Sequence, residues 1–271
     1  MLRPRARLSG RRRRRPGHES GVNKEDSVRY ESIAQKMRSY LEETGRSRSL
    51  LDETIRVSAR ALSAEEAIGN PEHDDYPLVA GRERMMEAEV RGAKGHAFTD
   101  MYGRWEGSLR DVCRMAAVNN FRRAIIVATL NAVTRLTGDA ECTIHCRDDG
   151  PVGCAGEIAP FATSEGLGPP FALIGYQPRL AEALAALGEL RIVDMDAQHV
   201  GEIKAGTEVL APERTEEALD GAACAFVTGT TIVNATIQRF LDLPIPTIFY
   251  GVTIAGGAAL LGLRRYCPAS S

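Results

Sequence analysis

Short apolar segments alternate with helical segments through the C-terminal part of this 271-residue chain, and this alternation constrains the fold more than any other feature. The apolar segments lack alternation of polar and apolar residues, and they span 171–175, 190–194, 223–228 and 247–250. Such strands are typical of a parallel sheet covered on both faces. Between and beside them we expect helices at 178–187, 215–219 and 231–241, and a polar loop that starts at Asp196. The fold class predicted for this part is therefore α/β.

The N-terminal part has strands followed by helices. A helix is expected over 26–43, ended by Gly45, and strands are expected near 55–62, 85–90 and 95–99. A short helix starts at Ser108, and the clearest helix of the chain covers 119–136. This last helix has an apolar stripe at 3.6-residue spacing and a glycine, Gly138, to stop it. These features predict a small α+β domain.

A Gly- and Pro-rich stretch at 166–170 separates the two patterns. We therefore expect four parts: a disordered basic extension (1–21), an α+β domain (22–138), a cysteine-containing connecting segment (139–167) and a parallel-sheet domain (168–271). The extension is interpreted as a translation start assigned too early, as a basic arm or targeting segment, or as a structural element.

Charge and composition exclude several classes of protein. The first 18 residues hold eight arginines and no acid, whereas the whole chain has a net charge of −2, so the body is acidic. An acidic body disfavours contact with phosphate backbones, and nucleic-acid binding would be confined to the tail. No apolar run reaches the ~18–20 residues that cross a bilayer. Six cysteines do not indicate a secreted disulfide framework, so we expect a cytoplasmic protein with reduced thiols.

A first candidate site follows from the carboxyl ends of the predicted parallel strands, where ligands of open α/β sheets bind. Gly229 would let backbone approach a ligand closely, and the next two threonines precede a predicted helix whose free N–H groups favour an anion. Asp194 stands where a ribose-binding acid would stand, but the G-x-G-x-x-G fingerprint is absent. The alternative is that the threonines only cap a helix. The candidate ligand-binding residues are Gly175, Gln177, Asp194, Gly229, Thr230, Thr231, Asn234 and Thr236.

A second candidate site is a cluster of thiols and an imidazole. Its proposed metal ligands are Cys142, His145, Cys146, Cys154 and Glu157. Thiolate and imidazole together suit a transition metal or an iron–sulfur cluster, although the spacing matches no zinc ribbon. If 141–146 were a strand, His145 would point away from the thiols, whereas a loop would allow one site. The alternatives are buried thiols beside a surface histidine, or redox chemistry between thiols.

Three segments resemble the Rossmann-like domain of the putative heavy-metal-chelation family. They are 171–178 (FALIGYQP), 227–236 (VTGTTIVNAT) and 250–256 (YGVTIAG), and G-[ST]-x-[LIV]-[VI]-N-x-T is the most specific pattern. That family also has a smaller domain similar to the N-terminal domain of enolase, and residues 49–138 fit it. The resemblance implies a site in the cleft between the two domains, whereas the chelation role is itself a proposal. The chain is short after Gly251, so we expect one late strand and helix to be missing.

Three functions follow from these observations. The main prediction is a heavy-metal or metallo-cofactor binding protein with its site in the interdomain cleft. The second is an enzyme that binds a small anionic or nucleotide-like ligand at the Gly229–Asn234 turn, with Asp194 or Asp196 on a sugar or acting as a base. The third is a non-catalytic scaffold with inert cysteines. The expected partner is a metal ion or a small anionic ligand, with no membrane, and a homodimer is compatible with such domains.

Overall fold

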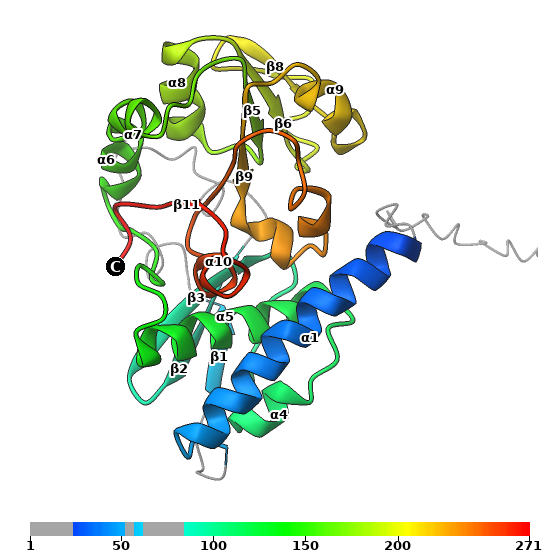
Figure 1. Ribbon diagram of the computed structural model, residues 1–271, viewed down its shortest axis with the longest axis vertical. Helices are drawn as coiled ribbons and strands as arrows, with labels where there is room; N and C mark the ends of the chain where they lie inside the picture. The colour runs from blue at the N-terminus through cyan, green and yellow to red at the C-terminus, as the bar shows by residue number, and fades with distance from the viewer. Residues whose placement is uncertain (1–23, 52–56, 62–83) are drawn as a thin grey trace, which may run out of the picture.

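The computed structural model describes residues 24–51, 57–61 and 84–271, which form an α/β fold around two sheets (Figure 1). The predicted basic extension 1–21 lies outside the described residues. Within them, no helix has both the length and the apolar character required to span a membrane.

The N-terminal sheet is antiparallel throughout, with strand order β3-β2-β1-β4. Its strands are β1 (Val57–Ala61), β2 (Arg84–Val90), β3 (Ala93–Thr99) and β4 (Trp105–Gly107). Its helices are α1 (Lys24–Ser47), α4 (Leu109–Cys113) and α5 (Asn120–Thr137). The prediction that Gly45 ends α1 was wrong, because the helix continues to Ser47. A Cβ at Gly45 would lie 2.7 Å from Leu51 Cδ2, so this glycine makes room for packing instead.

Helix α5 has the ends that its sequence predicts. The Asn119 side chain accepts a hydrogen bond from Arg122 N at 2.9 Å, and Gly138 ends the helix in the left-handed region at φ 81°. The sequence predicted one apolar stripe on this helix. In the structure every residue from 124 to 134 is buried, so the buried surface extends beyond that stripe. The helix packs on β2 and β3 and also contacts α1 and α10 (Figure 1). It is therefore enclosed from more than one side.

The C-terminal sheet has seven strands in the order β11-β10-β9-β5-β6-β8-β7. The strands are β5 (Phe171–Ile174), β6 (Leu190–Val193), β7 (Ile203–Lys204), β8 (Thr207–Leu210), β9 (Cys224–Thr228), β10 (Thr247–Tyr250) and β11 (Arg265–Tyr266). The helices are α6 (Gly150–Gly156), α7 (Ile158–Ser164), α8 (Pro178–Leu187), α9 (Thr215–Leu219) and α10 (Ala255–Leu261). All neighbouring strands are parallel except the β7–β8 pair, so the predicted parallel sheet is confirmed.

Three details of this part differ from the sequence prediction. Instead of a helix over 231–241 the chain forms two 3₁₀ turns, Gly229–Ile232 and Ile237–Arg239. Threonine hydroxyls compete for backbone groups there, and Ala235 has a positive φ of 57°. The predicted polar loop runs into the β7–β8 hairpin, whose two turn residues both have positive φ. The late helix and strand expected to be missing are present as α10 and β11.

The buried amide of Asn131 in α5 connects the two sheets. Its Nδ2 donates to the carbonyl oxygens of His96, Val252 and Thr253 at 2.8–3.1 Å, and its Oδ1 accepts from Gly256 N at 2.7 Å. One hydrophobic core accordingly runs from α1 and α5 into one face of the C-terminal sheet. A second, smaller core lies under α8 on the opposite face.

Candidate ligand-binding cleft

A cleft of about 1860 Å³ lies between the two sheets. The carboxyl ends of β5, β6, β9 and β10 line one side, and residues that follow β3 and precede α5 line the other. Small-molecule sites occupy about 300–1,000 Å³, so this cleft is large enough for an organic ligand. All eight strand-end candidates line it: Gly175, Gln177, Asp194, Gly229, Thr230, Thr231, Asn234 and Thr236. That they bind a ligand stays a prediction.

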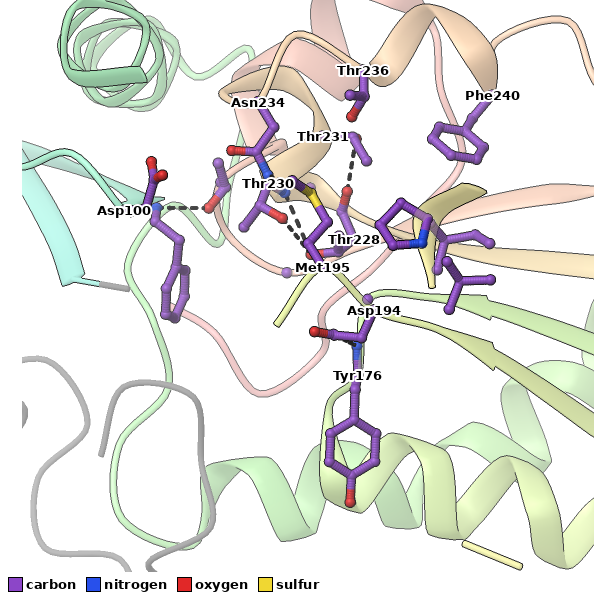
Figure 2. Close-up of a pocket in the computed structure, with 18 of the residues that line it drawn as sticks. Asp100, Tyr176, Asp194, Met195, Thr228, Thr230, Thr231, Asn234, Thr236 and Phe240 are labelled. Atoms are coloured by element: carbon purple, nitrogen blue, oxygen red, sulfur yellow. Dashed lines mark hydrogen bonds between the residues drawn. The ribbon is translucent and has the colours of Figure 1, made fainter. Parts of the chain in front are cut away.

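Asp194 is held rigidly at the end of β6. Its Oδ2 accepts from Tyr176 N at 2.5 Å, and its Oδ1 accepts from Asp196 N at 2.6 Å (Figure 2). The same Oδ1 lies 3.4 Å from His199 Nδ1. Because a carboxylate can only accept, His199 Nδ1 carries the proton and Nε2 carries the lone pair of the neutral ring. Asp194 therefore fixes the backbone at Tyr176 and Asp196, and its Oδ1 also orients the His199 ring.

His199 is a cleft residue that the sequence analysis did not select. The hydrogen bond that His199 donates to Asp194 raises the pKa of His199 above the ordinary value, and the charges of Asp194 and Asp196 act in the same direction. The Tyr176 ring meets the imidazole edge-on, with ring centroids 5.0 Å apart. The sequence offered one sign of the Asp194–His199 pair: the two residues are five positions apart.

The Gly229–Thr236 segment, where an anion was expected to bind, does not begin a helix. It starts with a four-residue 3₁₀ turn, Gly229–Ile232, which has fewer aligned peptide dipoles than a helix, and the Thr231 hydroxyl donates to Thr228 O. Anion binding by this segment stays a prediction. Gly229 is buried, and a Cβ there would lie 2.8 Å from Ile254 N. Asn234 does face the cleft: its Nδ2 lies 3.6 Å from Met195 Sδ, and its Oδ1 accepts from Asn120 Nδ2 at 3.3 Å. Figure 2 shows Asn234, Thr230 and Met195 grouped on one side, with the Tyr176 ring pointing away.

The predicted metal-binding segment is a loop and not a strand. His145, Cys146 and Cys154 line the cleft, whereas Cys142 and Glu157 do not. Cys142 has a positive φ of 57°, and its carbonyl accepts from Arg265 Nη2 at 2.6 Å. Glu157 is exposed to solvent at the junction of α6 and α7. Of the five predicted ligands, the structure therefore brings three to the cleft.

Two histidines organise this loop. His145 N donates to His96 Nδ1 at 3.2 Å, so His96 carries its proton on Nε2 and donates to Glu87 Oε2 at 3.0 Å. The hydrogen bond from His96, supported by Lys94, lowers the pKa of Glu87 to about 2. Thr143 adds a further anchor, because its Oγ1 donates to Lys94 O at 2.8 Å. Strand β3 therefore sets the position of the loop.

The His145 ring is suited to accept a metal ion. Its Nδ1 lies 2.5 Å from Cys146 O, and since a carbonyl only accepts, Nδ1 carries the proton. Burial lowers the pKa of His145 to about 4, so the ring is neutral at pH 7. Phe98 meets the ring edge-on at 5.4 Å between centroids. The second ring nitrogen, Nε2, therefore holds the lone pair that a metal ligand needs.

Cys267 is the residue that the sequence analysis missed. It follows β11 and lines the cleft together with Cys146 and Cys154. The Cys154 thiol donates a hydrogen bond to the Cys267 sulfur, which lowers the pKa of Cys267 and raises that of Cys154. Burial raises the pKa of Cys146 to about 12, and the charge of Cys267 adds to this effect. Its distance from the other cysteines along the chain gave no sign of this, because the pairing of β10 with β11 brings Cys267 to the cleft.

The thiol end of the cleft is not a ready-made tetrahedral site. Across residues 24–51 and 84–271, no three side chains among His, Cys, Asp and Glu form a group that could hold a metal ion. The predicted set of four or five ligands is therefore not assembled as such. What the structure does provide is three thiols and an imidazole that line the same cleft.

The charges that line the cleft are mainly negative. Among the described residues the lining holds two guanidinium groups, Arg123 and Arg239, and eight carboxylates: Asp26, Glu31, Asp100, Asp148, Asp194, Asp196, Glu213 and Glu216. Arg123 is also occupied, since its Nε donates to Val233 O at 2.5 Å and its Nη1 to Ala117 O at 2.9 Å. A surplus of one charge sign in a cleft raises the local concentration of the opposite ion. The cleft is therefore better suited to a cation than to an anion.

Comparison with known proteins finds a family to which the C-terminal part of the chain is similar. Residues 160–255 match the model of the DUF364 family, described as "Putative heavy-metal chelation". The matched segment runs from within α7 to the start of α10 and includes all eight strand-end candidates. No curated protein matches the chain.

Two solved structures of DUF364 proteins, both of unknown function, are similar to the chain. One, from Pyrococcus horikoshii, has 13% sequence identity and a TM-score of 0.50, and the alignment covers 82% of this chain and 79% of that one. The other, from Desulfitobacterium hafniense, has 16% identity and a TM-score of 0.45 and covers 66% of this chain and 72% of that one. At these identities, the similarity to the first structure concerns the fold.

Proposed function

We propose that this protein binds a heavy-metal ion, or a small metal-containing cofactor, in the cleft between its two sheets. The observation that carries this proposal is the gathering of Cys146, Cys154, Cys267 and His145 at a cleft whose charged groups are mainly carboxylates. Thiolate and neutral imidazole are the donors that soft and borderline metals prefer. The family description supports the same class of ligand.

The electrostatics of the cleft favour this function over binding of an anionic metabolite. A metal cation gains from the surrounding carboxylates, whereas a phosphate group would meet them as like charges. The segment expected to bind an anion forms a short 3₁₀ turn, whose dipole attracts an anion less than that of a full helix would. The cleft volume further suggests that an ion could enter as part of a larger complex, with Asp194 and Asn234 contacting its organic portion.

The proposed roles of the residues follow from their positions. His145 would offer Nε2, and the three cleft thiols would offer sulfur. Cys142 and Glu157 are left out of this set because they do not line the cleft. Glu87 and His96 would hold the loop in place, as partners of metal ligands commonly do.

The division of the chain belongs to the same proposal. We assign an enolase-N-terminal-like domain to residues 22–138, a connecting segment to 139–167 and a Rossmann-like domain to 168–271. The six cysteines are free thiols, which fits a reducing cytoplasm. The connecting segment would then carry His145, Cys146 and Cys154 to the cleft.

A second candidate function, an acid–base enzyme, rests on the hydrogen-bonded pair Asp194–His199. An imidazole oriented by a carboxylate at the end of a parallel strand can accept and return a proton. If cysteine variants lost metal binding, the proposed acid–base role of Asp194 and His199 would not be affected. The two functions are therefore separable by variants at opposite groups of residues.

The experiment that tests metal binding compares two triple variants. The chain should be purified under reducing, anaerobic conditions without a metal-affinity tag, loaded with Cd²⁺, desalted and analysed for metal. Wild type and a control variant with Cys113, Cys142 and Cys224 changed to Ala should retain the metal. The variant with Cys146, Cys154 and Cys267 changed to Ser should lose it while its far-UV circular dichroism stays unchanged. Equal retention by both variants, or none by wild type, would refute the proposal.

A further inference from the structure

A chain of polar side chains bridges the cleft from the first turn of α5 to the segment that follows β9. Arg123 Nη2 donates to Asn120 Oδ1. Asn120 Nδ2 in turn donates to Asp100 Oδ1 at 2.6 Å and to Asn234 Oδ1 at 3.3 Å. All four residues line the cleft. The two sides of the cleft are thus linked through the amide of Asn120.

This chain fixes the orientation of both amides. A guanidinium only donates and a carboxylate only accepts, so Asn120 turns Oδ1 to Arg123 and Nδ2 to Asp100. The remaining N–H of Asn120 donates to Asn234 and holds the Oδ1 of that residue in place. Asn234 is therefore oriented with its Nδ2 on the side of Met195.

In the described part of the chain, the Nδ2 group of Asn234 has a weak acceptor. Its partner is the Met195 sulfur at 3.6 Å, and a thioether accepts hydrogen bonds only weakly. An acceptor on a ligand would form a stronger hydrogen bond with this N–H. Asn234 therefore offers a donor to the cleft in a fixed direction.

Thr230 adds an acceptor one turn before Asn234. Asn234 N donates to Thr230 O at 2.9 Å, and Figure 2 shows the two side chains grouped on one side of the cleft. The Thr230 hydroxyl lies 3.2 Å from Thr228 Oγ1, and whichever of the two donates, Thr230 Oγ1 keeps a lone pair. A donor and an acceptor therefore face the cleft from the same turn.

A lactam matches this pair of groups. A cyclic amide holds its C=O and N–H on one edge, whereas an open-chain amide is trans and points them in opposite directions. A lactam is also neutral, and the carboxylates of the cleft disfavour an anion. Met195 is 59% exposed, and its polarisable side chain packs well on flat rings. Nucleobases such as uracil and hypoxanthine combine a flat ring with a lactam edge.

We propose that Asn234 and Thr230 bind the lactam edge of a nucleobase beside Met195, and that Asn120 is the positioning residue that orients Asn234. The lactam C=O accepts from Asn234 Nδ2, and the lactam N–H donates to Thr230 Oγ1. This inference goes beyond the proposed function, because it requires no metal ion at the thiol end of the cleft.

The test measures the affinity of the full chain for two matched pairs of nucleosides by isothermal titration calorimetry. Inosine and uridine present a C=O and an N–H where adenosine and cytidine present an amino group and a bare ring nitrogen. Wild type should bind the lactam member of at least one pair about 10-fold or more tightly than its partner, because the wrong member sets donor against donor. The two pairs also separate a purine from a pyrimidine ligand.

Two variants test the roles of the amides. Asn234→Asp has nearly the same shape but replaces the donor by an acceptor, so it should reverse the preference within the pair. Asn234→Ala should abolish the preference if the aspartate variant fails to fold.

Asn120→Ala allows Asn234 to turn over and should bring the ratio of the two affinities close to one. A merely structural role of Asn120 would weaken both nucleosides and keep the ratio. Asn119→Ala removes the cap of the same helix and leaves the amide chain intact, so this matched control should keep the wild-type ratio.

The outcomes separate this inference from the proposed function. Failure of wild type to bind inosine or uridine, or an unchanged preference in the Asn234 variants, would overturn the lactam site. An unchanged ratio in Asn120→Ala would overturn the positioning role. The variant with Cys146, Cys154 and Cys267 changed to Ser should bind the lactam as wild type does, and a loss there would also overturn the inference. Failure of wild type to retain Cd²⁺ would instead refute the proposed function and leave the lactam site in place.

Discussion

The side-chain oxygen of Asn131 accepts a hydrogen bond from the backbone N–H of Gly256 at 2.7 Å, and this bond joins helix α5 to helix α10. The amide nitrogen of Asn131 meanwhile donates to three carbonyl oxygens, one of them in β3. Every polar atom of this buried side chain thus has a partner across the junction of the two sheets. A residue with a side chain would not fit at position 256 without a shift, because a Cβ there would lie 3.0 Å from Asn131 Oδ1.

Replacing Asn131 by Ala should therefore destabilise the protein strongly. The change leaves buried backbone groups without partners, and we expect a decrease in the free energy of unfolding of about 2–4 kcal/mol. Urea unfolding followed by circular dichroism measures the change. Asn119→Ala, which removes only the N-cap of the same helix, is the control and should cost about 1 kcal/mol. A smaller effect at Asn131 than at Asn119 would contradict the role of this junction.

The close packing of β3 on α5 makes a second prediction. A Cβ at Gly95 would lie 2.3 Å from Ala132 N and 2.4 Å from Ala128 O, and neither backbone atom can move alone. Gly95→Ala should lower the free energy of unfolding by at least about 1–3 kcal/mol through overpacking. Gly153→Ala has open space around its Cβ in α6 and should be neutral or slightly stabilising. Thermal unfolding of both variants would decide, and equal melting temperatures would refute the argument.

The ion pair of Glu87 predicts how stability depends on pH. The hydrogen bonds from His96 and Lys94 lower the pKa of Glu87 to about 2, below its ordinary value of 4.5. A lowered folded-state pKa stabilises the protein above pH 4.5, and this contribution disappears as the pH falls from 4.5 towards 2. Its size is on the order of 2 kcal/mol. Glu87→Gln should flatten the acid limb of the stability curve, measured by urea unfolding between pH 7 and pH 3. An unchanged limb would mean that the pair is not formed in solution.

The pair Asp194–His199 can be tested by titration. The hydrogen bond that His199 donates to Asp194 raises the pKa of His199. The pair therefore stabilises the protein below the ordinary histidine pKa and loses this effect as the pH rises through the raised value. Asp194→Asn should lower the pKa of His199, measured from the imidazole resonances in an NMR titration. Asp196→Asn, which removes only a nearby charge, should lower it less. A larger shift in the Asp196 variant would contradict the hydrogen bond as the main cause.

Local patterns in the sequence were sufficient to predict most helices and strands. The ends of α5 are determined by Asn119 and Gly138, whose capping preferences act within one turn. The apolar segments of the C-terminal part pair as a parallel sheet, as predicted. The helix predicted over 231–241 does not form. The Thr231 hydroxyl donates to Thr228 O, and the positive φ of Ala235 interrupts the helical backbone.

Part of the candidate site could likewise be predicted from the sequence, and part could not. The eight residues at the strand ends could be found from sequence alone, because parallel strands all end at one edge of the sheet. The metal-binding candidates could not, because their spacing in sequence says little about a loop. Cys142 and Glu157 lie near the other candidates in the chain but do not line the cleft, whereas Cys267 lies far along the chain and does.

The sequence by itself determined the α/β class, the order of the strands along the chain and the edge of the sheet where a ligand would bind. These depend on apolar periodicity and on capping, which act over a few residues. Only the tertiary structure decided that β11 places Cys267 in the same cleft as Cys154, and that β3 positions the loop of His145 through His96. Such contacts depend on which distant segments pack together, and this is set by the burial of whole surfaces.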